Sequence, residues 1–582
     1  MSVRSVVIHG HFYQPPREDP WLNQVAAEPS AAPFHDWNQR IEQECYRAVV
    51  AARLYAPDGR IAQIVNTLAS ISFNFGPTLL EWLERQAPST YAAVLEADRL
   101  SRERRGGHGN AIAMPYHHAI LPLSSRRDKV TEVRWGIADF RRRFGRDPEG
   151  MWLPETAVDP ETLDVLAAEG IRFTILAPHQ VEHAPAGGSP GRYRTAGGRS
   201  LALFVYDGPI SHDVAFGPLL KDAAAWVKRL VATQQGASPP RLVAVATDGE
   251  TYGHHHRFGE VALAWLLREL ERRRDVRVEN VAAFLARHPP QHEVTLVAPT
   301  SWSCQHGVER WRADCGCRMA PERPTQQRWR APLREALDWL AGELHARFER
   351  EGSELFTDPW AARDAYGAVV SSDEAASARF VTEQMRRPVD AARRVRAREL
   401  LDLERNALRM FTSCGWFFDD IAGLESVQIL RYAARAVELA GTDAPRLEAG
   451  VLDRLARAES NEPGAGTGRD VYLSRVKRRV PVDAASRSDW DTGGTGGDAA
   501  RELLRAVTRL EHDHSSRAIA VVTELADRVQ RDGSPVPFDA QTVFYRIRAA
   551  SPPDWAAQLA PAAWRLGFAD GNGEEKGEGG DH

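Results

Sequence analysis

The chain has 582 residues, of which 43% are hydrophobic and 26% are charged, and its net charge is −5. This length exceeds what one compact core accommodates, so we expect two or three domains. The balanced charge gives no electrostatic reason to expect nucleic acid or a membrane surface as the main partner. No apolar run reaches membrane-spanning length, no signal peptide is recognisable, and five cysteines do not suggest a disulfide framework. We therefore expect a cytoplasmic protein, and the composition leaves its oligomeric state open.

Short apolar segments alternate with amphipathic helical segments over roughly the first half of the chain. Alternation of this kind predicts a parallel sheet with helices outside it. Polar residues follow one strand after another, and a closed barrel gathers all its strand ends at one mouth, whereas an open sheet gathers only those at its switch point. We therefore expect an α/β fold with a barrel over residues 1–300. The expected strands lie at residues 3–8, 61–68, 71–75, 111–114, 171–176, 201–206 and 242–247.

The second half of the chain has helical periodicity without the apolar strand segments of the first half. We expect residues 301–460 to form a helical region near the barrel mouth and residues 501–570 to form a helical C-terminal segment. Residues 461–500 are rich in Gly, Ser and Asp and indicate a flexible linker or loop, and the Gly- and Glu-rich residues 571–582 indicate a disordered tail. Neither a G-x-G-x-x-G fingerprint after the first strand nor a Walker lysine is present, which argues against nucleotide binding.

Two carboxylates lie just past the ends of predicted strands. Asp248 directly follows the apolar run 242–247, and Glu155 follows a Leu-Pro pair at another strand end. Glycoside hydrolysis with retention requires two carboxyl groups in one mouth, because one attacks the anomeric carbon and the other donates a proton to the leaving oxygen. Taken alone, Glu155 is also compatible with a helix cap or a surface charge. Glu250 is the alternative to Asp248, and we expect only one of the two to face the cleft.

Two other interpretations remain open at this stage. The first is a metal-dependent carbohydrate hydrolase or deacetylase on a related barrel, in which Zn²⁺ has four candidate ligands: His9, His11, Asp248 and His254. The second is a non-catalytic glucan-binding or scaffold protein. Sensitivity to a chelator separates the first from a carboxylate mechanism, and a turnover assay on malto-oligosaccharides separates the second.

Four motifs, taken in order, resemble the successive regions of glycoside hydrolase family 57, the group of amylases, glucanotransferases and branching enzymes. The motifs are His11-Phe-Tyr-Gln14-Pro15, Gly109-Asn-Ala-Ile-Ala-Met-Pro115-Tyr116-His117-His118, Trp152-Leu-Pro-Glu155 and Asp248-Gly-Glu250-Thr-Tyr-Gly253-His254-His255. The resemblance covers residues 1–290 or so and implies a (β/α)7 barrel followed by a mostly α-helical region. It also implies retaining chemistry on α-glucans through a covalent glycosyl-enzyme intermediate. The segment after residue 300 resembles an uncharacterised C-terminal extension of some members.

The same resemblance implies roles for individual residues. Glu155 matches the family's nucleophile and Asp248 its general acid/base. The first motif departs from the family pattern, because Phe12 and Tyr13 separate its histidine from Gln14. His11, His117, His254 and Trp152 match positions that line the sugar site. In all, we expect the following residues to contact the substrate: His11, Gln14, His117, Trp152, Asp207, His212, Glu250, His254, His255 and Trp302.

We expect neither a cofactor nor a metal ion to take part in the reaction. Hydrolysis, glucanotransfer and branching share the covalent intermediate and differ in whether water or a sugar hydroxyl attacks it. The sequence therefore does not separate these three activities.

A cluster of potential soft-metal ligands lies outside this picture and consists of Cys304, His306, Cys315 and Cys317. The functional interpretation is a soft-metal or redox site. The spacing fits no standard zinc pattern, since no C-x-x-C is present. We therefore expect a tight, glycine-punctuated loop with buried thiols beside the barrel mouth.

Overall fold

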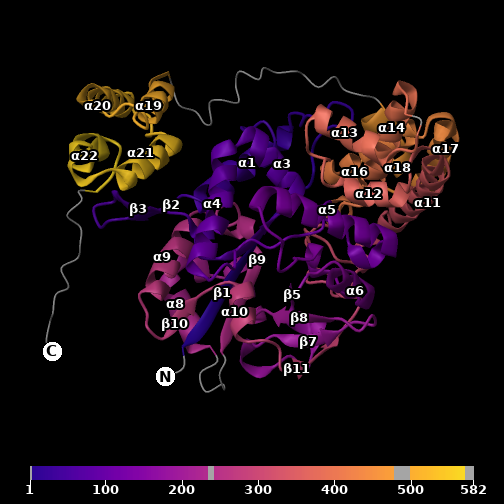
Figure 1. The fold of residues 1–582 in the computed structure, drawn as a ribbon, viewed down its shortest axis with the longest axis horizontal. Helices are drawn as coiled ribbons and strands as arrows, with labels where there is room; N and C mark the ends of the chain where they lie inside the picture. Colours follow the sequence, from indigo (N-terminus) through magenta and orange to yellow (C-terminus); the bar gives the residue numbers. More distant parts are fainter. Residues whose placement is uncertain (1–2, 234–240, 388, 478–497, 570–582) are drawn as a thin grey trace.

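The protein consists of an α/β domain followed by a long helical region (Figure 1). Within the part of the chain that the structure describes, no helix is both long enough and apolar enough to cross a membrane. The predicted disordered tail, 571–582, lies outside the described residues, as does the middle of the predicted linker, 478–497. The computed structural model describes residues 3–233, 241–387, 389–477 and 498–569.

Strand β1 (Arg4–Phe12) is the centre of the main sheet, and all nine of its residues are buried. Strand β9 (Leu242–Asp248) runs parallel to it along most of its length and places Asp248 opposite His11. The pairing therefore brings one of the predicted carboxylates beside one of the predicted histidines. Two further parallel partners of β1 are β4 (Ser72–Phe75) and β10 (Val276–Val278).

Strand β1 is longer than the strand predicted at residues 3–8. Its C-terminal half pairs with β4 as far as Phe12, so regular backbone hydrogen bonding continues through two histidines. A polar side chain interrupts an apolar pattern, which is why the prediction stopped there. In the structure His9 is buried because Ser72 and Asn74 satisfy its ring nitrogens, each at 3.1 Å. His11 therefore stands within the strand and not on the loop after it.

Beyond β4, parallel contacts continue through the short segments 111–113 and 150–151 to a further pair of strands. Strand β5 (Phe173–Leu176) pairs in parallel with β8 (Ser200–Val205), and beyond β8 the backbone N–H of Asp207 donates to the carbonyl of Ala244 on β9 at 2.7 Å. Between β4 and β5 the contacts are the single parallel bridges Phe73–Ala111, Ala113–Met151 and Gly150–Phe173.

The segment predicted as a strand at 61–68 does not belong to this sheet. Strand β3 (Ile61–Val65) instead pairs antiparallel with β2 (Ala52–Tyr55). A short apolar run identifies a strand but not its partner, so the sequence could not assign it to a sheet. The remaining strands are β6 (Val181–Glu182), β7 (Gly191–Arg194), β11 (His292–Glu293) and β12 (Thr295–Leu296).

Helices surround this sheet, and several begin at the capping residues that the sequence provides. The side chains of Ser125, Asp159 and Asn280 each accept a hydrogen bond from a backbone N–H in the first turn of the helix they precede. The helices are α1 (Trp37–Ile41), α2 (Arg47–Val49), α3 (Pro77–Gln86), α4 (Pro88–Arg104), α5 (Arg126–Phe144), α6 (Pro160–Ala168), α7 (Gly208–Ala215), α8 (Ala223–Ala232), α9 (Gly259–Glu271) and α10 (Val281–Arg287).

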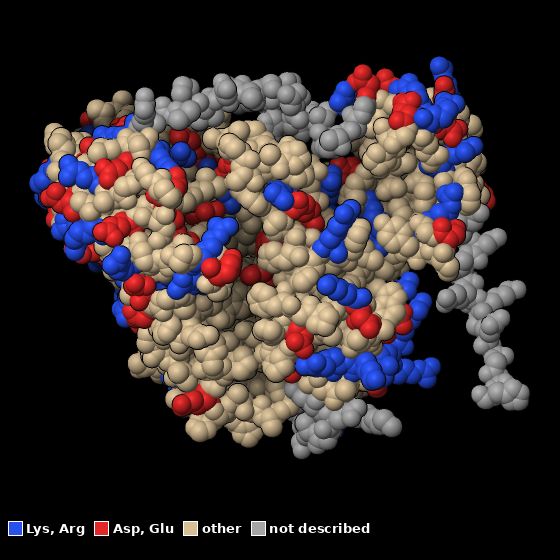
Figure 2. Space-filling model, turned by 180° about the vertical axis from the view of Figure 1, so that it is seen from behind, with Lys and Arg blue, Asp and Glu red and all other residues tan. Residues whose placement is uncertain are grey.

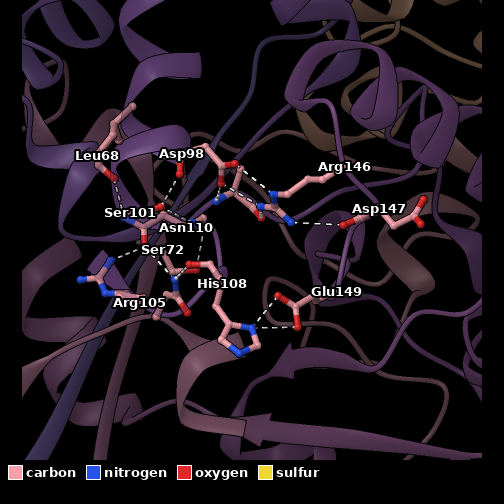
Figure 3. A network of polar contacts seen from close by, with 12 residues as sticks. Leu68, Ser72, Asp98, Ser101, Arg105, His108, Asn110, Arg146, Asp147 and Glu149 are labelled. Carbon is pink, nitrogen blue, oxygen red and sulfur yellow. Dashed lines mark hydrogen bonds and ion pairs between the residues drawn. The ribbon is translucent and has the colours of Figure 1, made fainter. Parts of the chain in front are cut away.

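A buried polar network holds the chain where it enters the sheet between β4 and β5 (Figure 3). The carboxylate of Asp98 accepts two hydrogen bonds from the guanidinium of Arg146, at 2.8 and 3.0 Å, and one from the backbone N–H of Ala111 at 2.9 Å. The Asn110 side chain donates to the carbonyl of Leu68 at 2.8 Å. These bonds satisfy backbone groups that a short strand leaves unpaired, and they fix the segment that ends in the second histidine motif.

The second half of the chain builds a separate apolar core from helices, shown in orange in Figure 1. In its longest helix, α11, the buried residues Leu333, Leu337, Leu340 and Leu344 recur at helical spacing. Tyr432 donates to the carbonyl of Pro16 at 2.9 Å and so ties this core to the loop after β1. The helices are α11 (Arg330–Leu355), α12 (Pro359–Tyr366), α13 (Glu374–Gln384), α14 (Ala391–Arg409), α15 (Cys414–Phe417), α16 (Leu424–Leu439), α17 (Ala444–Leu455) and α18 (Gly468–Val471).

Part of the segment predicted as a linker, 461–500, is helical. A capping box between Thr467 and Asp470 starts α18, which continues as a π-helical turn at Tyr472–Lys477, and Val471 is buried against the preceding helices. The glycine-rich composition obscured this short amphipathic stretch. The last helices, yellow in Figure 1, pack on the β2–β3 hairpin and are α19 (Asp498–Arg509), α20 (Ser516–Arg531), α21 (Phe538–Ala550), α22 (Pro553–Gln558) and α23 (Ala560–Arg565).

Candidate active site

Glu155 lies on a strained turn. It belongs to the 3-10 turn Pro154–Thr156, and its φ of 56° and the φ of 49° at Thr156 both fall in the left-handed region. Non-glycine residues pay about 1–3 kcal/mol for such a conformation, which is concentrated at functional sites. The side chain of Gln180 holds the turn by donating to the carbonyl of Thr156 at 2.8 Å.

The Glu155 carboxylate is held by two donors from a distant loop. The indole N–H of Trp302 and the hydroxyl of Ser303 both donate to Oε2, at 3.1 and 2.6 Å. Its other oxygen, Oε1, makes no hydrogen bond to any residue that the structure describes. Burial raises the pKa of Glu155, while the Ser303 and Trp302 hydrogen bonds and the positive charge of Arg310 oppose that rise. These contacts favour the ionised carboxylate that a nucleophile requires.

Asp248 has a contrasting environment. Its side chain is exposed at the end of β9 and has no hydrogen-bond partner among the described residues. The pKa of Asp248 is nevertheless raised well above its usual range, because the surrounding protein displaces bulk water and because Glu250 and Glu155 add negative charge nearby. A carboxyl group that is reachable yet poorly hydrated and beside other carboxylates is suited to carry a proton near neutral pH.

The side chain of Glu250 is buried, unlike that of Asp248. Its carboxylate accepts hydrogen bonds from the backbone N–H of Tyr13, at 3.1 Å, and from the hydroxyl of Tyr46, and the residue is 6% exposed. Burial raises the pKa of Glu250 to about 7. The chain leaves the extended conformation after Asp248 and enters the 3-10 turn Gly249–Tyr252, which separates the two carboxylates in direction. Of the pair, Asp248 is the one exposed to solvent.

Neutral histidines and aromatic rings form a layer beside Asp248. His11 lies opposite Asp248 across the strand pair, and its Nε2 is 3.2 Å from Nε2 of His118. Its ring stacks on Trp152 with centroids 5.2 Å apart, and Trp152 meets Trp302 edge-on at 5.1 Å. Burial lowers the pKa of His11 to about 3 and that of His118 well below its usual range. These rings therefore act as uncharged hydrogen-bonding groups.

His117, which was predicted to contact substrate, has a different environment from its neighbour His118. Its Nδ1 is 2.7 Å from a carboxylate oxygen of Glu132, and its ring packs against Trp135. Within the part of the chain that the structure describes, His117 contacts neither His11 nor Glu155, whereas His118 lies beside His11 and, at 2.7 Å, the hydroxyl of Ser413. A substrate role for His117 stays a prediction.

Asp207 directly precedes helix α7, and His212 lies within it. The Asp207 carboxylate caps α7 by accepting from the backbone N–H of Ile210 at 2.9 Å, because the first turn of a helix leaves its N–H groups unpaired. The side chain of His212 is 71% exposed and lies 3.8 Å from Asp213. Neither residue contacts Glu155 or Asp248 in the structure, and a substrate role for Asp207 and His212 stays a prediction.

The other predicted residues lie on neighbouring loops. Gln14 donates to the carbonyl of Tyr13 at 3.1 Å, and His254 bonds to Glu44 and meets Trp37 edge-on. His255 follows on the same turn, and loss of hydration next to the protein, together with the neighbouring His254 and His256, lowers its pKa to about 4. Their predicted substrate contacts remain predictions.

The zinc interpretation of the strand ends is not supported. His9 and His11 both bond to Asn74, while His254 bonds to Glu44, so the four proposed ligands do not converge. Among the described residues, one group of His, Cys, Asp or Glu has three or more ligand atoms close enough to hold a metal ion, and it is made of Cys304, His306, Cys315 and Cys317.

Two residues of the site were not predicted from the sequence. His118 was overlooked although it directly follows His117; its φ of 57° lies in the left-handed region, so the chain turns at this point and the two neighbouring rings have different contacts. Ser303 lies 148 positions from Glu155, and no periodic signal relates the two. Ser303 lies in a long loop that contains two glycines, and long loops often carry functional residues. This is the one sequence feature that could have drawn attention to Ser303.

Part of the sequence of this chain is similar to that of known proteins. The 4-alpha-glucanotransferase of Thermococcus litoralis is 22% identical over 186 residues, which are 31% of this chain and 26% of that protein. Alpha-amylase 1 of Dictyoglomus thermophilum is 28% identical over 106 residues, which are 18% of this chain and 15% of that protein. The chain thus spans about a quarter or less of the length of these relatives.

One solved structure matches nearly the whole chain. The crystal structure of an exo-type maltose-forming amylase from Pyrococcus sp. ST04 has a TM-score of 0.63 at 15% identity and covers 97% of this chain and 98% of its own. This likeness concerns the fold. The model described as Domain of unknown function (DUF3536) matches residues 326–484, and the model described as Glycosyl hydrolase family 57 matches residues 7–297, half of the chain. The chain belongs to glycoside hydrolase family 57.

Proposed function

We propose that the protein is a retaining glycoside hydrolase or transglycosylase that acts on α-glucans. Glu155 is the nucleophile and Asp248 is the general acid/base. The observation that carries this proposal is the contrast between the two carboxyl groups, which lie close enough for the charge of Glu155 to raise the pKa of Asp248. Hydrogen bonds favour the ionised form of Glu155, whereas its surroundings favour the protonated form of Asp248.

The reaction follows from these two protonation states. The Glu155 carboxylate attacks the anomeric carbon and forms an ester to the sugar, while the bond to the leaving oxygen breaks and that oxygen takes the proton of Asp248. The resulting Asp248 carboxylate then removes a proton from an incoming hydroxyl, which attacks the anomeric carbon and releases Glu155. Water as the acceptor gives hydrolysis, and a sugar hydroxyl gives transfer.

The proposed fold of the catalytic domain is a (β/α)7 barrel. Its strand positions are β1, β4, β5, β8 and β9 together with the short segments 111–113 and 150–151. The hydrogen bond from Asp207 to Ala244 connects the end of β8 to β9 and supports closure of the series. A barrel of this kind gathers its strand ends in one mouth, which accounts for the convergence of Glu155, His11 and Asp248.

The helical region completes the same mouth in this proposal. Ser413 bonds to His118, and the guanidinium of the buried residue Arg310 raises the stability of the ionised Glu155. Figure 2 shows a hollow near the centre of one face, with Asp and Glu side chains lying in it. An α-glucan is the proposed substrate because the relatives named above are an amylase and a glucanotransferase.

Incubation of the protein with maltoheptaose, followed by chromatography of the products, tests this function. Hydrolysis yields only shorter oligosaccharides, whereas transfer yields both shorter and longer ones. Glu155→Gln abolishes either pattern, and Glu103→Gln, at an exposed glutamate in α4, serves as the matched control. An absence of turnover on linear and branched α-glucans, with an intact fold, would refute the proposal.

A further inference from the structure

The cluster of Cys304, His306, Cys315 and Cys317 has the geometry of a closed metal site. One ligand atom from each residue lies within 4.8 Å of all the others. Sγ of Cys304 is 3.9 Å from Sγ of Cys315 and 3.9 Å from Sγ of Cys317, and Sγ of Cys317 is 3.6 Å from Nδ1 of His306.

These separations match tetrahedral zinc. Zn–S bonds of ~2.3 Å and Zn–N bonds of ~2.0 Å place two sulfurs about 3.8 Å apart and a sulfur and a nitrogen about 3.6 Å apart. A disulfide would need two sulfurs at about 2.05 Å, and all five cysteines are free. Three soft sulfurs and one imidazole nitrogen in a tetrahedron are a donor set that selects Zn²⁺ over hard cations.

A buried positive charge lies beside the cluster and would balance the net charge of a metal site there. Three thiolates and one neutral imidazole around Zn²⁺ carry a net charge of −1. The guanidinium of Arg330 is fully buried, makes no ion pair with a described residue and donates to the carbonyl of Cys317 at 2.8 Å. Burial of a cation is costly, and a negatively charged thiolate–metal site beside it would offset part of that cost.

The loop that carries the cluster has little regular secondary structure. Between β12 and α11 the chain has only one short 3-10 turn, Glu309–Trp311, over more than thirty residues. Loops of that length without regular structure are uncommon in compact domains and cost ordering entropy. Gly307 and Gly316, with φ of 82° and 79°, make the left-handed turns that return the chain to the cluster.

We infer that Cys304, His306, Cys315 and Cys317 bind one Zn²⁺ ion, which holds the loop that places Ser303 and Trp302 on Glu155. On binding, the three thiols release their protons to solvent and the imidazole coordinates in its neutral form. The ion takes no part in the chemistry, since it has four protein ligands and no open position. The positioning effect rests on the proposed function, because Cys304 directly follows the two donors to the Glu155 carboxylate.

Metal analysis of the purified full-length protein tests the site without reference to activity. One zinc per chain is expected by mass spectrometry of the metal content. After removal of zinc, addition of Co²⁺ should give the thiolate-to-cobalt charge-transfer absorption of a tetrahedral sulfur site. Protein that contains no stoichiometric metal and takes up neither Zn²⁺ nor Co²⁺, with its thiols reduced, would overturn the assignment.

Variants locate the metal on these four residues. Cys317→Ser and His306→Ala should lose the zinc, whereas His306→Cys, which supplies another soft ligand, should retain it. Cys45→Ser is the matched control, because Cys45 is a buried thiol outside the cluster and its substitution should leave the metal content unchanged. If a variant fails to fold, release of zinc from the folded parent by a thiol-binding mercurial, followed with a chromogenic chelator, gives the same answer. Zinc retained by both Cys317→Ser and His306→Ala would refute the ligand set.

The positioning role has its own readout. As the pH is lowered, zinc-free protein should lose activity at a higher pH than the zinc-bound form. The reason is that a loosened loop no longer stabilises the ionised Glu155. Bound zinc without any turnover of α-glucans would refute the proposed function and leave the metal site standing. Turnover with an identical pH profile in the presence and absence of zinc would refute the positioning role alone.

Discussion

Removal of the Ser303 hydroxyl tests how the protein sets the ionisation of Glu155. The hydroxyl donates to Oε2 of Glu155 at 2.6 Å, and it is the strongest of the contacts that oppose the effect of burial on the pKa of that carboxyl. Ser303→Ala removes this donor, so the pKa of Glu155 rises further. Since the nucleophile must be ionised, activity should be lost at a higher pH than in the parent protein as the medium becomes more acidic.

The size of the effect follows from the strength of the bond. A hydrogen bond to a charged group contributes about 1.5–3 kcal/mol, and 1.36 kcal/mol corresponds to one pH unit. Glu155 is half-buried, so water replaces part of the lost bond. The expected displacement of the acidic limb of kcat/KM is therefore near the lower end, about one pH unit.

The assay is the rate of maltoheptaose turnover measured across the acidic and neutral range. Ser303→Thr keeps the hydroxyl and should restore the parent profile. Ser301→Ala is the matched control in the same loop, because Ser301 donates to the carbonyl of Gly307 at 2.7 Å and not to Glu155. If the acidic limb of Ser303→Ala coincides with that of the parent, the ionisation of Glu155 does not control the rate and the reasoning is wrong.

Three further predictions concern groups with other roles. Asp248→Asn should lower kcat on maltoheptaose by about two to four powers of ten without changing Tm, and a smaller loss on substrates with an acidic leaving group would show that the missing proton is the cause. Asp98→Ala leaves the guanidinium of Arg146 without its partner and should lower the free energy of unfolding in urea by about 3–5 kcal/mol; a change below about 1 kcal/mol would contradict the structural role of the network. Burial raises the pKa of Glu250 to about 7, so the folded state holds a proton that the unfolded state releases, and stability falls as pH rises from about 4.5 to about 7. Glu250→Gln should remove this loss, which is at most about 3 kcal/mol, and equal pH dependence in both proteins would contradict it.

Much of the fold was accessible from local patterns. The α/β character of the first half and the helical character of the second were predicted from the period of apolar residues, and α11, α14 and α16 all lie in the region 301–460 that was predicted to be helical. Strand pairing was harder, because it depends on contacts between distant segments. The segment 61–68 illustrates this: its apolar run is a strand, but its partner β2 places it outside the main sheet.

The candidate site was predicted unevenly for the same reason. Glu155 and Asp248 stand out because a polar group interrupts the chain just after an apolar strand. Ser303 and Ser413 contact the site from loops far along the chain, and no local pattern relates them to it. Asp207 carried the same local signal as Asp248, yet the first turn of α7 uses its carboxylate as a cap.

A trapping experiment tests the central claim most directly. An α-glucosyl fluoride that bears a second fluorine beside the ring oxygen forms the glycosyl-enzyme faster than the intermediate breaks down. After digestion, mass spectrometry should find one glycosyl group on the peptide that contains Glu155, with fragmentation locating it on that side chain. A label on Asp248 or Glu250, or consumption of the reagent with no label on any peptide, would contradict Glu155 as the nucleophile.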